Sequence, residues 1–220
     1  MRFRLFNKDL GLVEKASKII HFLVKFSLII AFISAFLVGN WTVLFVAGLT
    51  FILISLPSLF EKRYKIDIPV EFEIIIVIFL YASIFLGEVH GYYTKFWWWD
   101  IILHTGSGFV LGFLGFIILY IFYKGNKIKA DPLTIVIFSF CFAVAIGAVW
   151  EIFEFAMDQI FILNMQKSGL NDTMWDLIVD SIGALFASFL GYIYLKKGEV
   201  FLFKKVVKNF EKQNPRLFKK

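Results

Sequence analysis

The sequence has only one cysteine, four prolines and 18% charged residues in a chain of 220. The single cysteine, Cys141, excludes an intramolecular disulfide, and its place in an apolar run indicates a small packed hydrophobe. The chain also lacks a DNA- or RNA-binding motif, so its net charge of +6 is not assigned to nucleic acid. We find no low-complexity linker, no clear internal repeat, no acid-phosphatase signature and no glycine-rich phosphate loop.

Apolar residues are what the sequence has in excess. They make up 60% of the chain, with 29 phenylalanines, whereas soluble domains average about 45–50%. The excess is concentrated in runs of about 20 residues, the length of a helix that spans a bilayer. The first run is too long for the apolar core of a signal peptide, so we interpret it as a retained span. The sequence therefore predicts an integral membrane protein surrounded by lipid.

The apolar runs predict an all-α fold with six transmembrane helices in one bundle. The predicted spans are 19–38, 41–60, 72–92, 100–123, 133–157 and 174–195. They form one domain, residues 19–195. A basic segment, residues 1–18, precedes it and is predicted to lie on the membrane surface. A basic tail, residues 196–220, follows it.

The distribution of Lys and Arg predicts the orientation. The N-terminal segment carries five, the loops after the second and fourth spans carry three each, and the tail from Lys196 carries nine. The connections on the other side carry only Lys95 and Lys167. By the positive-inside rule, both termini are predicted to be cytoplasmic.

This orientation gathers acidic residues and histidines at the outer ends of the last four spans. Asp100 and His104 are four residues apart, as are Asp176 and Asp180, so each pair shares a helix face. Small residues, among them Gly108 and Gly183, would let these helices approach closely. The outer set comprises Glu88, His90, Asp100, His104, Glu151, Glu154, Asp158, Asp172, Asp176 and Asp180.

Ionisable groups within membrane spans are costly and need a partner, so the strongest candidates are those inside the spans. We expect a divalent metal, Mg²⁺, Mn²⁺ or Zn²⁺, to be held by ligands chosen from six residues. These are Asp100, His104, Glu151, Glu154, Asp176 and Asp180. Glu151 or Glu154 would serve as the general base.

Four residues of the outer set have a structural explanation that does not require a metal or a reaction. Asp172 follows Asn171 and precedes an apolar run, which favours the N-cap of the sixth span. Asp158 is equally well explained as an interfacial, hydrated carboxylate. Glu88 and His90 lie beside Gly91 at a helix end, where a solvated loop is at least as good an explanation as ligation.

Three blocks in order resemble an uncharacterised bacterial inner-membrane family that includes YjdF. They cover roughly residues 97–190. Ile101 stands where the family often has an Arg, so a role tied to that charge does not carry over. The sequence is more loosely similar to VanZ-like membrane proteins, which are linked to glycopeptide resistance at the cell envelope. The blocks are Asp100-x3-His104 continuing to Gly108-Phe109, Trp150-Glu151-x2-Glu154, and Asp172-Thr173-x-Trp175-Asp176 continuing to Gly183-Ala184.

Neither resemblance implies a reaction, so three hypotheses stay open. The first is a metal-dependent enzyme acting on a lipid or lipid-linked envelope substrate at the outer leaflet. The second is a proton- or cation-coupled transporter, for which a homo-oligomer could complete the pathway. The third is a non-catalytic membrane protein in which the polar groups form a structural core or bind a headgroup or partner.

Overall fold

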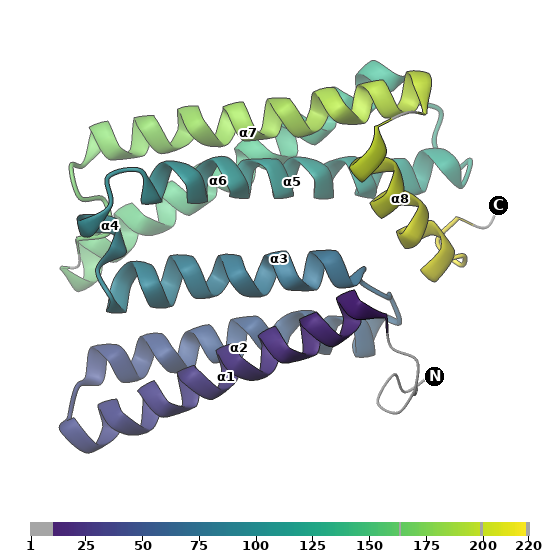
Figure 1. The fold of residues 1–220 in the computed structure, drawn as a ribbon. Coiled ribbons are helices and arrows are strands. Elements are labelled where there is room, and N and C mark those ends of the chain that lie inside the picture. Colours follow the sequence, from purple (N-terminus) through teal and green to yellow (C-terminus); the bar gives the residue numbers. More distant parts are fainter. Residues whose placement is uncertain (1–10, 163, 199, 219–220) are drawn as a thin grey trace. The chain divides into compact units, whose positions relative to one another are not determined.

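The computed structural model of the chain describes residues 11–162, 164–198 and 200–218, and every regular element in these ranges is a helix (Figure 1). Six of the helical segments are long and apolar enough to cross a membrane. The all-α class and the number of candidate spans are thereby confirmed. The cytoplasmic placement of the termini stays a prediction.

The chain divides into two compact units, Met1–Lys95 and Phe96–Lys220, each with three candidate spans. The sequence predicts one six-helix bundle, and that arrangement stays a prediction. The basic segment at residues 1–18 is described only in part. Residues 1–10 lie outside the described ranges, and residues 12–18 continue into the first spanning helix without a break.

Unit 1 is built on aliphatic and aromatic packing. Gly39 ends its first helix in the left-handed conformation, and the Asn40 side chain accepts a hydrogen bond from Val43 N at 3.1 Å to begin the next. Its buried core comprises Leu28, Ala47, Ile54, Val77 and Phe85. The helices of unit 1 are α1 (Leu12–Val38), α2 (Trp41–Tyr64), α3 (Val70–Leu80), the π-helix η2 (Tyr81–Val89) and α4 (Tyr92–Lys95).

Unit 2 places three long helices alongside one another, with a shorter helix across one end (Figure 1). Asp131 caps the second long helix by accepting a hydrogen bond from Thr134 N at 2.7 Å, and Pro132 occupies the first turn. The helices are α5 (Trp99–Lys124), α6 (Pro132–Phe161), α7 (Leu170–Lys197) and α8 (Phe201–Gln213).

Helices α5 and α7 meet backbone to backbone. A Cβ atom at Gly108 would collide with the carbonyl of Asp180, and one at Gly183 would collide with the carbonyl of Thr105. This reciprocal contact confirms the predicted role of the small residues. Further down, the buried Ser139 hydroxyl of α6 donates to the Gly112 carbonyl of α5 at 2.5 Å. The three helices are therefore fixed in register next to the polar residues.

The basic tail contains a helix that the sequence analysis does not foresee. Phe203 and Val207 of α8 are buried. The Phe203 ring lies edge-on to Phe113 and Phe116, with centroids 4.5 Å and 4.9 Å apart. The Tyr120 hydroxyl of α5 donates to Glu211 Oε1 at 2.8 Å. The tail thus begins as part of the unit 2 core.

Candidate functional site

A polar cluster forms where the close contact between α5 and α7 brings two pairs of side chains together. Asp100 and His104 come from the first two turns of α5, and Asp176 and Asp180 from successive turns of α7. His104 Nε2 lies 3.6 Å from Asp100 Oδ1 and 3.8 Å from Asp176 Oδ2, and its Nδ1 lies 3.3 Å from Asp180 Oδ2. Asp176 and Asp180 are each 4% exposed. One imidazole is therefore surrounded by three carboxylates.

Asp180 is held so that it orients the His104 ring. Its Oδ2 faces His104 Nδ1, and its Oδ1 lies 2.8 Å from the Ser107 hydroxyl. Helix α6 passes this carboxylate at Gly147, where an added Cβ would come within 2.7 Å of Asp180 Oδ2. A proton on Nδ1, donated to Asp180, leaves the Nε2 lone pair facing Asp100 and Asp176. Asp180 is thus the positioning partner of His104.

Asp100, His104 and Asp176 have the spacing of a metal site. One ligand atom from each residue lies within 4.8 Å of those from the other two. The separations of 3.6 Å and 3.8 Å from His104 Nε2 are too long for hydrogen bonds. Ligand atoms about 2.1 Å from a shared ion are themselves separated by roughly 3 to 4 Å. The three side chains are therefore close enough together to hold a divalent cation, and the set of six ligands stays a prediction.

Glu151 of α6 is the second unusual group in unit 2. It is 4% exposed, and neither carboxylate oxygen accepts a hydrogen bond from the described part of the chain. Thr173 is close enough to interact with it, but its hydroxyl does not reach hydrogen-bonding geometry. Glu151 also lies within electrostatic range of His104 and Asp180. A buried carboxylate without a donor needs a proton or a cation nearby.

Glu154, the other predicted base, is satisfied differently. Its Oε1 accepts a hydrogen bond from the Trp150 indole at 2.9 Å, one turn earlier on α6. It interacts electrostatically with Glu151 and more weakly with His104. Of the two glutamates, Glu151 is therefore the one for which neither oxygen accepts a hydrogen bond from the described residues.

The secondary candidates have structural positions. Asp158 accepts hydrogen bonds from Met165 N at 2.7 Å and Gln166 N at 2.9 Å, which fixes the α6–α7 connection. The predicted N-cap role of Asp172 is wrong, because α7 begins at Leu170 and is capped by Gly169. Asp172 lies in the first turn, where a carboxylate still interacts favourably with the helix dipole. Glu88 and His90 are exposed residues of unit 1 and are not placed relative to this cluster.

The structure adds one residue that sequence reasoning does not select. Lys167, in the α6–α7 connection, places its Nζ 3.2 Å from Asp100 Oδ2, with both side chains partly exposed. The only sequence signal is that Lys167 is one of two lysines on the predicted outer side. The α6–α7 connection thus brings the ammonium group of Lys167 next to Asp100 of the polar cluster.

Comparisons with known proteins place this architecture in a family. An uncharacterised protein of Thermotoga maritima is 31% identical over 127 residues, which cover 58% of this chain and 65% of that protein. No solved structure matches the chain. The likeness to VanZ-like proteins stays a prediction. Residues 18–197, which hold nearly all of the six candidate spans and the polar cluster, match the family described as "Predicted membrane protein (DUF2238)", the family of YjdF, and the chain belongs to it.

Proposed function

We propose that unit 2 binds a divalent cation at Asp100, His104 and Asp176 and uses it in hydrolysis or group transfer on a lipid or lipid-linked substrate. The observation that carries this proposal is the convergence of the three ligand atoms within 4.8 Å. Asp180 supports it, because a ligating histidine commonly donates its other ring N–H to a carboxylate.

The donor set favours particular ions. One imidazole and two carboxylates suit Zn²⁺ or Mn²⁺ better than Mg²⁺, which prefers oxygen ligands and keeps several waters. Three protein ligands also leave a position for water or substrate, as in catalytic zinc sites. The local charges support this choice, since a divalent cation would offset the carboxylates of the partly exposed Asp100 and the buried Asp176.

Each side chain then has a defined task. A bound cation would supply Lewis acidity, polarising a substrate oxygen or acidifying a water molecule. Asp180 and Ser107 hold the His104 ring in place. Glu151 would accept a proton from that water molecule as general base, because it is buried beside the cluster and its oxygens accept no hydrogen bond from the described residues. Glu154 remains paired with Trp150.

The expected position of the polar cluster in the membrane is the reason for proposing a lipid or lipid-linked substrate. Asp100 is in the first turn of α5, whereas the lysine-rich α5–α6 connection follows its last turn, so cluster and basic loop lie at opposite ends of this helix. The positive-inside rule puts the basic end in the cytoplasm. We therefore place the protein in the cell membrane, with both termini cytoplasmic and the cluster near the outer leaflet.

The test is metal analysis of the purified full-length protein in mild detergent. Wild type equilibrated with Zn²⁺ or Mn²⁺ should retain about one ion per chain after gel filtration, and Asp100→Asn/Asp176→Asn should retain none. Glu88→Gln removes an exposed carboxylate of unit 1 and serves as the control. Retention of the ion by a folded double variant would refute the proposal.

Glu151 also supports a second candidate, a proton- or cation-coupled transporter. A buried carboxylate on a spanning helix that, like Glu151, accepts no hydrogen bond from the described residues can take up and release a proton. Proteoliposomes would then show proton or metal-ion flux that Glu151→Gln abolishes. If the cluster is only a structural core, Asp176→Asn should fold and leave both metal content and flux unchanged.

A further inference from the structure

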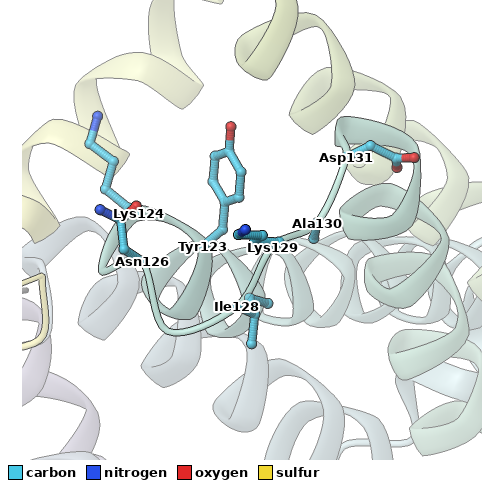
Figure 2. A pocket seen from close by; sticks show the side chains of 7 residues that line it. All are labelled: Tyr123, Lys124, Asn126, Ile128, Lys129, Ala130 and Asp131. Atoms are coloured by element: carbon cyan, nitrogen blue, oxygen red, sulfur yellow. The ribbon is translucent and has the colours of Figure 1, made fainter.

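A cavity of about 590 Å³, largely open to its surroundings, lies around the α5–α6 connection at the end of unit 2 away from the polar cluster (Figure 2). Its lining includes Tyr123, Lys124, Asn126, Ile128 and Lys129. We propose that this cavity binds the phosphate headgroup of an anionic phospholipid. The proposal is independent of the metal site.

The connection presents its lysines on an ordered turn. Gly125 N donates to the Ile121 carbonyl at 3.0 Å, and Lys127 N donates to the Phe122 carbonyl at 2.9 Å. Asn126 has φ of 55°, a left-handed conformation that asparagine tolerates better than most residues. Because these bonds fix the backbone, the points from which the lining side chains extend are set before any ligand arrives.

The lining has the chemistry that a phosphate diester requires. Lys124 and Lys129 supply positive charge, and the Asn126 amide and Tyr123 hydroxyl can donate hydrogen bonds. Figure 2 shows the Tyr123 side chain rising from the end of α5, with Lys124 beside it in the view. Ile128 adds an apolar wall on which the glycerol region of a lipid can pack.

The lining holds one acid, Asp131, against the two lysines Lys124 and Lys129. Asp131 Oδ1 accepts the hydrogen bond from Thr134 N at the start of α6. That bond lowers the pKa of Asp131, so the carboxylate stays ionised and committed to capping the helix. Lys196 of α7 also interacts with Asp131 electrostatically. The charge left facing the cavity is therefore positive.

The level of the cavity, at the ends of two candidate spans, indicates a lipid headgroup as the source of the phosphate. The cavity lies between the last turn of one candidate span, which ends at Lys124, and the first turn of the next, which begins at Pro132. Ends of spans lie at headgroup level. Helix α8 reinforces this, because Phe203 and Val207 are buried while Lys205, Lys208 and Lys212 are exposed. Such a basic face attracts anionic lipids.

Native mass spectrometry of the full-length protein in neutral detergent tests the proposal, with phosphatidylglycerol and phosphatidylcholine of equal acyl chains as probes. We expect wild type to bind phosphatidylglycerol about tenfold more tightly than phosphatidylcholine. Lys124→Gln/Lys129→Gln should lose most of this preference. Lys205→Gln/Lys208→Gln removes the same charge outside the cavity and should keep it. Asn126→Asp tests the site without removing a lysine, and it should weaken phosphatidylglycerol binding several-fold.

Three results would overturn the proposal. The first is equal loss of preference in both lysine pairs, which would mean unspecific attraction to the basic end. The second is displacement of phosphatidylglycerol by millimolar inorganic phosphate with the same dependence on Lys124 and Lys129, which would make the ligand free phosphate. The third is unchanged binding in a correctly folded Asn126→Asp variant.

Discussion

The two units each carry three apolar candidate spans, yet they bury different groups. Among the described residues of unit 1, the buried polar side chains are Ser17 and Thr50, both uncharged. Unit 2 buries Glu151, Asp176 and Asp180 as well as neutral polar residues. In the described part of unit 1, three candidate spans therefore pack without burying a charged side chain.

This difference means that packing does not account for the acids of unit 2. An ionised carboxylate near the bilayer centre costs about 2.5 to 3.5 kcal/mol on insertion scales. Unit 2 carries several buried carboxylates within its candidate spans, on helices that meet through close glycine contacts. The cation proposed above would give these acids a partner, and the direct backbone contact between α5 and α7 is what brings them together.

The largest expected effect tests the backbone contact of unit 2. Gly108→Ala should lower the stability of unit 2 by roughly 3 kcal/mol, because the new methyl group overlaps the Asp180 carbonyl, which cannot move alone. Thermal unfolding in detergent would show it as a fall of about 10 °C. Gly106→Ala is the control on the same helix, since no atom lies within 4 Å of its Cβ. In unit 1, the new methyl group of Gly48→Ala would lie 3.3 Å from the Phe32 ring, which can shift, so the loss of stability should be small.

The next effect separates ligand from positioning partner within the cluster. Asp180→Asn should weaken cation binding by about 10- to 100-fold while leaving one ion per chain at saturation, because the three proposed ligands remain. Isothermal titration with Zn²⁺ or Mn²⁺ measures both quantities. Ser181→Ala alters the same turn, but its hydroxyl bonds only to the Leu177 carbonyl of its own helix, so it should bind like wild type. An Asp180→Asn protein with wild-type affinity would contradict the assignment.

The smallest expected effect concerns Lys167, whose removal should strengthen cation binding rather than weaken it. Its ammonium lies 3.2 Å from Asp100 Oδ2 and competes with a cation for that carboxylate. A partly exposed pair of this kind is worth up to about 1 kcal/mol, so Lys167→Gln should tighten cation binding by up to about fivefold. Lys95→Gln removes a lysine that donates to the His90 carbonyl in unit 1 and should change nothing. Weaker binding by Lys167→Gln would show that the lysine supports the site instead.

Several features follow from the sequence alone. Length and apolarity of the runs define the six candidate spans, because a helix must satisfy its own backbone in lipid and needs about 20 apolar residues to cross it. The spacing of Asp100 with His104, and of Asp176 with Asp180, follows from helical periodicity. The sequence thereby points to the end of unit 2 where the cluster forms.

Only the tertiary structure separates the roles within that cluster. Periodicity makes Asp176 and Asp180 equivalent, but the approach of α5 at Gly108 turns one toward His104 Nε2 and the other toward Nδ1. The contact of Lys167 with Asp100 and the docking of α8 by Phe203 likewise join residues far apart in sequence. Helical spacing fixes which residues share a face, whereas the partner of that face depends on how the helices pack.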